Sequence, residues 1–235
     1  MTKLEIVIPV LNEEKVLASS VTILHEFLTQ HMTNYDWQIT IADNGSTDST
    51  REIACGLATR ISRTKLYTID IRGRGLALKK VWLSSAADIM AYMDVDLSTD
   101  LLYLKPLIDT VHSNEFQIAI GSRLMRDSLV SGRSLQREIT SRGYSILFRT
   151  LFRTSFKDAQ CGFKAISRQA VNEILPLVKN DKWFFDTEML ILAEKKGYKI
   201  KEIPVRWRDD PDSRVNILST ALEDVKGLCR LLVKS

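Results

Sequence analysis

The feature that most constrains the fold is an alternation, over the first 112 residues, of short apolar runs with segments of helical periodicity. The runs at residues 4–10, 37–42, 66–71 and 89–93 are rich in β-branched and other apolar side chains, which is typical of strands buried on both faces. Each run is followed by a polar turn and then by apolar residues at helical spacing, and we expect the first helix to begin at residues 12–14. This pattern predicts an α/β fold, with a mostly parallel sheet, right-handed crossovers and helices on both faces.

The rest of the chain contains the same kinds of element at less regular spacing. We expect helices at residues 101–112, 134–152 and 183–196 and strands at 116–120, 164–166 and 200–205. An apolar stripe at residues 218–232 predicts a final helix that packs on the core. No linker or low-complexity tract divides the 235 residues, whose 45% apolar composition can bury one large core. We therefore predict a single domain, residues 1–235.

Composition and local patterns exclude several classes of protein. The three cysteines, Cys55, Cys161 and Cys229, lack CxxC spacing and nearby histidines, so we expect buried thiols in a reducing compartment. The first residues lead into a strand without a signal-peptide pattern, which favours a cytoplasmic protein. No window of about 18 residues is free of charge, so we expect no transmembrane helix.

One segment, residues 123–157, is strongly basic although the net charge of the chain is only +4. We therefore expect an anionic partner there. Aromatic and aliphatic residues share the helical run with the arginines, which fits a helix on an anionic membrane surface as well as a core helix with snorkelling arginines. Nucleic acid is disfavoured, because no zinc, helix-turn-helix or stacking-aromatic signature is present.

Carboxylates follow three of the predicted strands: Glu13, Asp43 and the pair Asp94 and Asp96. The carboxyl ends of parallel strands form one rim, which is where open α/β sheets bind ligands. In an extended chain Asp94 and Asp96 point the same way and can share a divalent cation with phosphate oxygens and water. Each carboxylate can instead cap the next helix. Together they favour a metal-and-diphosphate site.

Several nucleotide and hydrolase sites are disfavoured by missing motifs. Gly73-Arg74-Gly75 lacks the third glycine of a dinucleotide fingerprint, and neither a P-loop nor a GxSxG elbow is present. The acidic stretch at residues 11–14 follows the first predicted strand, where a nucleotidyltransferase would need a glycine-rich, lysine-bearing loop for a triphosphate.

Six motifs occur in order at residues 8–14, 43–48, 94–96, 121–123, 160–164 and 185–188. They resemble family 2 inverting glycosyltransferases of the GT-A fold, a Rossmann-like α/β fold. Within that family the chain is most similar to the polyprenyl-phosphate hexosyltransferases, such as dolichyl-phosphate glucosyltransferases and mannose synthases. The resemblance implies a nucleotide-sugar-binding half at residues 1–122, and an acceptor half with membrane-side helices at 123–235.

The resemblance also implies roles for individual residues. Arg123 and Arg137 would bind the acceptor phosphate, for which guanidinium groups are well suited. Asp94 and Asp96 would hold Mg²⁺ or Mn²⁺, whereas Ser98 is a poorer ligand. The nucleotide sugar would be bound by Pro9, Asn12, Glu13, Asp43, Arg74, Asp94, Val95, Asp96, Arg208, Ser213 and Arg214.

The catalytic assignment depends on the acceptor. A lipid phosphate is already ionised and needs no strong base, whereas a sugar hydroxyl needs one. Asp158 and Asp186 are the candidate bases and join Asp96 as candidate catalytic residues. Asp158 can instead cap a turn, and Asp186 can place a favourable charge at the start of a helix.

The resemblance and the basic segment together predict hexose transfer to a polyprenyl phosphate by a peripheral enzyme at the cytoplasmic face of a membrane. UDP-glucose is the first expected donor and GDP-mannose the second. Two alternatives stay open: a family 2 enzyme with a saccharide or protein acceptor, and a nucleotide-sugar-binding protein without catalysis.

Overall fold

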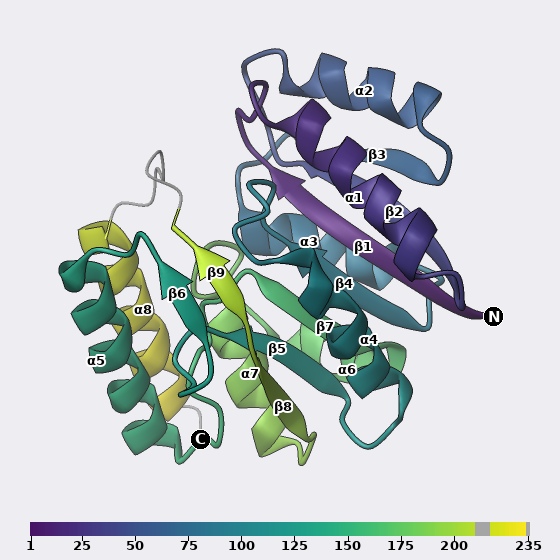
Figure 1. Cartoon of the computed structure of the whole chain (residues 1–235). Coiled ribbons are helices and arrows are strands. Elements are labelled where there is room, and N and C mark those ends of the chain that lie inside the picture. The colour runs from purple at the N-terminus through teal and green to yellow at the C-terminus, as the bar shows by residue number, and fades with distance from the viewer. Residues whose placement is uncertain (210–216, 234–235) are drawn as a thin grey trace.

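The computed structural model describes residues 1–209 and 217–233, with side chains in the second range from residue 220 onward. Seven strands form one twisted sheet in the order β3-β2-β1-β4-β7-β5-β8 (Figure 1). The alternating apolar runs of the sequence supply its centre, where β1 and β4 are almost completely buried. The strands are β1 Thr2–Val10, β2 Tyr35–Asp43, β3 Thr64–Thr68, β4 Ile89–Met93, β5 Ile118–Ser122, β7 Phe163–Ser167 and β8 Ile200–Pro204.

Helices cover both faces of the sheet, as predicted. The helices α1 Leu17–His31, α2 Thr50–Arg60 and α4 Leu104–His112 pack on one face. The opposite face is covered by α3 Arg74–Ser84, α6 Arg168–Ile174 and α7 Phe185–Lys195. Beyond α7 lie α5 Leu135–Phe152 and α8 Ile217–Val233, side by side at one end of the molecule (Figure 1). The prediction of an α/β fold is confirmed.

One central strand runs against the others. β7 is antiparallel to both of its neighbours, β4 and β5, whereas the other pairings in the sheet are parallel. The chain therefore enters β7 from the rim at which β4 and β5 end. As a result the segment before β7, residues 158–162, lies against the end of β4, and the Asp94 amide donates to the Gly162 carbonyl at 3.1 Å.

Several local expectations are wrong. The first helix begins at Leu17 rather than at residues 12–14, because Asn12 adopts a left-handed conformation (φ 58°) and its side chain accepts from the Thr47 amide at 2.7 Å. The sequence pattern did not predict α6, nor the short ribbon of β6 Leu129–Ser131 with β9 Arg206–Arg208. Two short 3-10 turns, Leu101–Tyr103 and Leu175–Leu177, flank α4 and α6.

The structure also tests the expectations that the cysteines are buried and that no helix spans a membrane. Cys161 is buried, but Cys55 and Cys229 are exposed, so burial is confirmed for one of the three; all three are free thiols. Trp37 is buried in the core on the face covered by α1, α2 and α4, and Trp82 is buried in the core on the opposite face. Within the described ranges, none of the helices is long and apolar enough to cross a membrane.

Candidate active site

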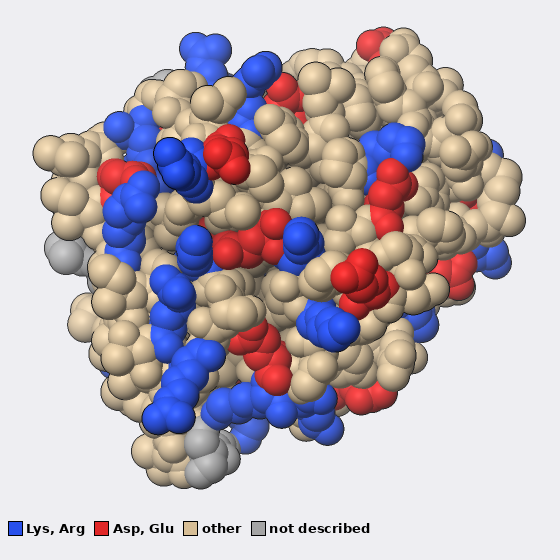
Figure 2. Space-filling model, turned by 60° about the horizontal axis from the view of Figure 1, so that its bottom comes forward, with Lys and Arg blue, Asp and Glu red and all other residues tan. Residues whose placement is uncertain are grey.

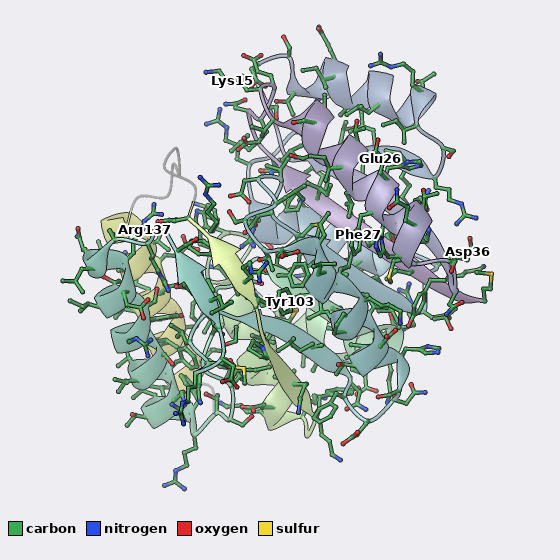
Figure 3. The ribbon with its side chains drawn as sticks, viewed as in Figure 1. Lys15, Glu26, Phe27, Asp36, Tyr103 and Arg137 are labelled. Atoms are coloured by element: carbon green, nitrogen blue, oxygen red, sulfur yellow. The ribbon has the colours of Figure 1, made fainter. Side chains whose placement is uncertain are left out.

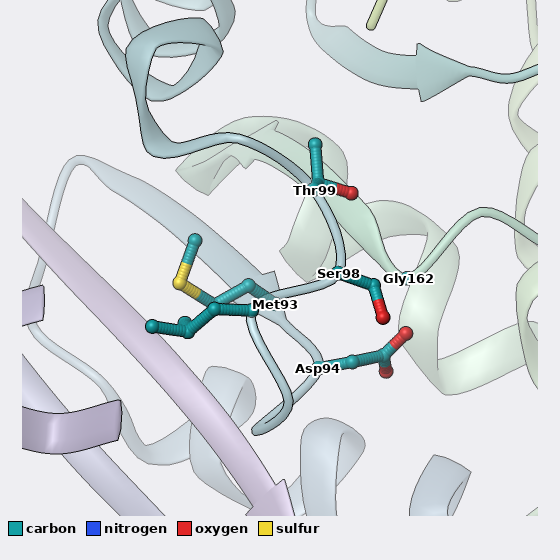
Figure 4. A pocket seen from close by; sticks show the side chains of 6 residues that line it. Met93, Asp94, Ser98, Thr99 and Gly162 are labelled. Atoms are coloured by element: carbon teal, nitrogen blue, oxygen red, sulfur yellow. The ribbon is translucent and has the colours of Figure 1, made fainter. Parts of the chain in front are cut away.

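Strand β4 brings Asp94 to the carboxyl rim of the sheet, but Asp94 and Asp96 lie on a turn rather than on extended chain. The Leu97 amide donates to the Asp94 carbonyl at 3.2 Å, and Leu97 has φ 51°. The expectation that the two carboxylates simply alternate along a strand is therefore wrong. Asp94 lines a small pocket, in which its carboxylate and the Ser98 hydroxyl point toward each other beside Gly162 (Figure 4). Asp96 is exposed and accepts from the Ser98 amide at 2.9 Å.

The two carboxylates of the Asp94–Asp96 turn would supply part of the ligand shell of a divalent cation, and the remaining ligands would have to come from outside the described part of the protein. A Cβ atom at Gly162 would lie 1.8 Å from Asp94 Oδ2, so only glycine leaves this carboxylate room. Burial raises the pKa of Asp94, and the charge of Asp96 adds to this rise against the opposing effect of Arg74. Among the described residues no group of three or more His, Cys, Asp or Glu could hold a metal. Two carboxylates completed by phosphate oxygens and water are a common arrangement for Mg²⁺.

Arg74 connects this turn to a buried ionic network. Its Nη1 lies 2.8 Å from Asp186 Oδ2, and its Nη2 lies 3.4 Å from Asp94 Oδ1 and 3.0 Å from the Tyr92 hydroxyl. The guanidinium also stacks at 5.2 Å over the ring of Trp183. Arg74 is therefore oriented by four neighbours before any substrate binds.

The glycines around Arg74 explain why this short motif departs from a dinucleotide fingerprint. A Cβ at Gly75 would lie 2.5 Å from the Phe185 Cβ, and one at Gly73 would lie 2.6 Å from the Asp181 carbonyl oxygen. Both glycines thus allow the start of α3 to approach the chain at the start of α7. The close approach brings Arg74 and Asp186 together.

Lys164 is a member of this network to which the sequence assigned no role. Its side chain is 0% exposed, and its Nζ lies 3.0 Å from Asp186 Oδ1 and 3.1 Å from the Tyr92 hydroxyl. It also donates to the Cys161 carbonyl. A lysine inside the apolar strand Phe163–Ser167 was the available signal, because buried lysines require partners.

Asp186, a candidate base, is the centre of the network. It accepts from Arg74, Lys164 and the Tyr92 hydroxyl, and its side chain is 1% exposed. Burial alone would raise the pKa of Asp186, but Lys164 and Arg74 outweigh burial and hold the pKa below its usual value. This arrangement suits a carboxylate that stays ionised and orients its neighbours.

The residues predicted for the nucleoside lie at the carboxyl ends of β1 and β2 and on the loops that follow these strands. Asp43 is fully buried; its Oδ1 accepts from the Ser46 amide at 3.1 Å, and its Oδ2 lies 2.9 Å from Arg51 Nε. The Asn12 amide donates to Ser46 Oγ, and the Glu13 amide donates to Thr50 Oγ1. The two loops therefore interlock. Pro9, which lies on β1, and Val95, on the turn after β4, are both buried at the same rim.

On the other side of the Asp94 turn, Arg123 and Asp158 form a bidentate ion pair. The guanidinium donates from Nε and Nη2 at 2.8 and 2.9 Å, and the Arg123 amide donates to the same carboxylate at 2.8 Å. Burial opposes ionisation, yet Arg123 holds the pKa of Asp158 at about 2. Asp158 therefore orients Arg123, and its low pKa makes it a weak base.

Further arginines gather around Trp207 on β9. The guanidinium carbons of Arg123 and Arg133 lie 5.3 and 5.9 Å from the Trp207 ring centre. Burial and the neighbouring charge of Arg123 lower the pKa of Arg133, whose Nη1 lies 2.9 Å from Glu138. Arg137, at the start of α5 (Figure 3), forms a 2.5 Å ion pair with Asp209. Arg133 belongs to this basic cluster although the resemblance did not single it out.

Three of the residues predicted to bind the nucleotide sugar lie near the C-terminal end of the chain, and only one of them is among the described residues. Arg208 is exposed at the end of β9, and its amide donates to the Ser98 carbonyl at 2.9 Å, which connects β9 to the Asp94 turn. Ser213 and Arg214 lie outside the described residues.

An α/β sheet with paired aspartates at its rim, a buried ionic network on one side and an arginine cluster on the other suits a transferase that acts on phosphate-bearing substrates. Residues 5–175 match the model of glycosyl transferase family 2, and the chain belongs to this family of glycosyltransferases. The resemblance expected from the six motifs is confirmed.

Curated relatives and solved structures extend this result. Glycosyltransferase AglD of Haloferax volcanii is 36% identical over 94% of this chain. The aligned region covers only 35% of the length of AglD. The dolichyl-phosphate beta-glucosyltransferase of Dictyostelium discoideum is 29% identical over 97% of this chain and 73% of its own length. Glucosyl-3-phosphoglycerate synthase of Mycobacterium tuberculosis shares the fold, with a TM-score of 0.74 at 18% identity over 97% of this chain and 80% of that structure.

Proposed function

We propose that this glycosyltransferase transfers a hexose from a nucleotide sugar, with UDP-glucose as the first donor, to a polyprenyl phosphate. In this proposal residues 1–122 bind the donor and residues 123–235 bind the acceptor. The observation that carries it is the arginine cluster around Trp207, in which Arg123 and Arg133 face the same ring; burial and then the charge of Arg123 lower the pKa of Arg133. An anionic acceptor such as a lipid phosphate would relieve that repulsion.

The relatives support this choice of acceptor. Proteins named dolichyl-phosphate beta-glucosyltransferase from Dictyostelium discoideum and Saccharomyces cerevisiae align with 97% and 96% of this chain. A solved neighbour of the same fold, with a TM-score of 0.64, is described in complex with Mn²⁺, UDP-glucose and glycerol 3-phosphate. A nucleotide sugar and a phosphate-bearing molecule can thus be bound together by a protein of this fold.

The charges of the site favour a direct displacement. An ionised phosphate oxygen of the acceptor attacks the anomeric carbon, the bond from that carbon to the nucleoside diphosphate breaks, and the leaving group keeps the electron pair, so the anomeric centre inverts. Mg²⁺ or Mn²⁺ bound by Asp94 and Asp96 would neutralise negative charge on the leaving diphosphate. Arg74 supplies a fixed positive charge beside Asp94.

The two candidate bases also favour an acceptor that is already ionised. Asp158 is held by Arg123, and Asp186 is held by Arg74 and Lys164, so both carboxylates have strong ion-pair partners. A sugar hydroxyl would need a carboxylate free to accept its proton. A lipid phosphate needs positioning rather than proton removal.

The surface of α5 and α8 supports a peripheral position on a membrane. Figure 2 shows Lys and Arg side chains in a line along the side of the molecule where these helices lie. On α5 the aliphatic residues Leu135, Ile139 and Ile146 are 75%, 63% and 64% exposed, and Arg142 and Arg149 are exposed on the same helix. Exposed aliphatic and basic side chains on one helix suit the headgroup region of an anionic membrane. We propose that this is the cytoplasmic face.

The proposed function is tested by transfer of labelled hexose from UDP- and GDP-sugars to a short polyprenyl phosphate, with Mn²⁺ or Mg²⁺ and a no-lipid control. We expect an organic-extractable product from UDP-glucose only when lipid and metal are both present. Water-soluble product alone would reject the lipid acceptor in favour of a saccharide, and metal-independent binding of UDP-sugar without turnover would indicate a binding protein.

A further inference from the structure

The C-terminal helix α8 lies outside the residues that match the family model, yet it is docked tightly against the site. A Cβ atom at Gly227 would lie 2.3 Å from the Phe184 ring, so the α8 backbone rests directly on the residue after Trp183. Arg230 forms a 2.6 Å ion pair with the buried Glu188 of α7. Helix α8 is thus fixed next to the chain that stacks on Arg74.

One carboxylate on α8 points inward. Asp224 is 3% exposed, and its Oδ2 accepts from Gln160 Nε2 at 2.7 Å. Its Oδ1 is buried and accepts no hydrogen bond of good geometry among the described residues, and the Tyr144 hydroxyl of α5 lies close enough to this carboxylate to interact with it. A buried carboxylate with an unsatisfied oxygen costs free energy. Removing its charge would be expected to improve stability, so stability alone does not account for an acid at this position.

Gln160 is the middle of the segment that joins the two sides of the site. At one end Asp158 holds Arg123 of the basic cluster, and at the other Gly162 accepts from the Asp94 amide and leaves room for its carboxylate. A single five-residue segment therefore sets the position of the arginine cluster relative to the paired aspartates. The bond from Gln160 to Asp224 fixes the middle of this segment to α8.

We propose that Asp224 is a positioning residue: through Gln160 it holds residues 158–162 so that donor and acceptor sites keep the spacing that transfer requires. This inference rests on the proposed hexosyl transfer. Loss of the bond lets the two sites move relative to each other while each still binds its own substrate. The expected consequence is a lower kcat with little change in either KM.

The test compares four single variants and one double variant of the full chain. We expect Asp224→Leu and Gln160→Ala each to lower kcat about 10-fold with both KM values within about 2-fold of wild type. Combining them should cost no more than either alone, because both remove one bond. Asp224→Asn keeps an oxygen acceptor for Gln160 and should retain most of the kcat that Asp224→Leu loses.

Glu223→Leu is the matched control on α8. Glu223 accepts from Asn180 Nδ2 at 2.8 Å, so its loss weakens α8 docking without touching Gln160. We expect Glu223→Leu to lower Tm relative to the wild-type protein but to keep kcat. Equal losses of kcat in Glu223→Leu and Asp224→Leu would reduce the role of Asp224 to stability and overturn the proposal.

Amide hydrogen exchange provides a readout that needs no substrate. We expect exchange in residues 158–162 to be faster in Asp224→Leu than in Glu223→Leu. Unchanged exchange in that segment would overturn the positioning role. If the wild-type protein makes no lipid-linked product, the proposed function fails, and the exchange experiment still decides whether Asp224 orders the segment.

Discussion

The two sides of the Asp94 turn hold their charges in different ways. On the donor side Arg74, Lys164, Asp94 and Asp186 form one connected network, in which Asp186 and Lys164 are almost completely buried. On the proposed acceptor side the arginines form separate small groups: Arg137 pairs with Asp209, Arg133 and Arg142 share Glu138, and Arg123 pairs with Asp158, which is as buried as the Arg74–Asp186 pair. A connected, buried network fixes geometry, whereas separate pairs can exchange a carboxylate for an anionic ligand. Under the proposed function, this contrast would place a rigid donor site beside an adaptable acceptor site.

The largest effect is expected at the turn between the two sides. Asp96→Ala should lower transfer by about 10³-fold or more, because it removes one of the two carboxylates that would hold the metal. The Tm should change by less than about 2 °C, since Asp96 is exposed. Steady-state rates and thermal unfolding measure both. Full activity of the wild-type protein in excess chelator would contradict the metal site.

Removing one cation from each side compares the two networks directly. Lys164→Met should destabilise the fold by about 3–5 kcal/mol, because it leaves Asp186 with less compensation in a buried site. Arg137→Met, whose side chain is 26% exposed, should cost less than about 1 kcal/mol. Urea unfolding gives both values. Equal costs would erase the proposed difference between the sides.

A smaller effect separates acceptor from donor binding. Arg137→Ala should raise KM for the polyprenyl phosphate about 10-fold, the loss of about 1.4 kcal/mol expected for one charge-assisted hydrogen bond. KM for the nucleotide sugar should change less than about 2-fold. Steady-state kinetics with each substrate varied in turn provides the measurement. Parallel rises in both constants would remove Arg137 from the acceptor site.

The smallest expected effect concerns pH. Burial and the nearby charge of Glu223, with a contribution from Asp186, raise the pKa of Asp224 to about 7. Because the folded-state pKa lies above the unfolded value, the associated stability is complete below about pH 4 and is lost as pH rises through about 7. Asp224→Asn does not lose this stability as pH rises, because the asparagine side chain does not ionise. Its Tm should exceed that of wild type by about 3 °C at pH 8 and by less at pH 5. A difference in Tm that does not change with pH would argue against a raised pKa of Asp224 in the folded state.

The sequence predicts the parts of this molecule that depend on local periodicity. Strand β4, residues 89–93, has the predicted bounds, because a fully apolar run flanked by charged residues leaves few alternatives. The direction of β7 was not predictable in this way, since an apolar run carries no information about whether its neighbours run parallel. The left-handed conformation of Asn12 likewise depends on Thr47 and Ser46, which lie more than 30 residues away.

The residues of the candidate site also divide into those that could be predicted from local sequence and those that depend on distant residues. The carboxylates at strand ends could be predicted, because the ends of parallel strands lie at one rim of the sheet. The pairing of Arg123 with Asp158 and of Lys164 with Asp186 was not, because it requires the three-dimensional placement of residues 22 to 35 positions apart. Pairing also decides chemistry, as the low pKa of Asp158 illustrates. The roles assigned to Pro9, Glu13, Asp43 and the other donor residues stay predictions.

The reversed direction of β7 has a consequence for how such proteins can diversify. Because β5 ends and β7 begins at the same rim, the chain between them, residues 123–162, leaves and re-enters the sheet at neighbouring points. Residues 123–157 of this segment can be lengthened, shortened or replaced while the strands that carry Asp43 and Asp94 and the contact of Gly162 with Asp94 stay in place. If the segment binds the acceptor as proposed, exchanging residues 123–157 between family members would change the acceptor and leave the donor side unaltered.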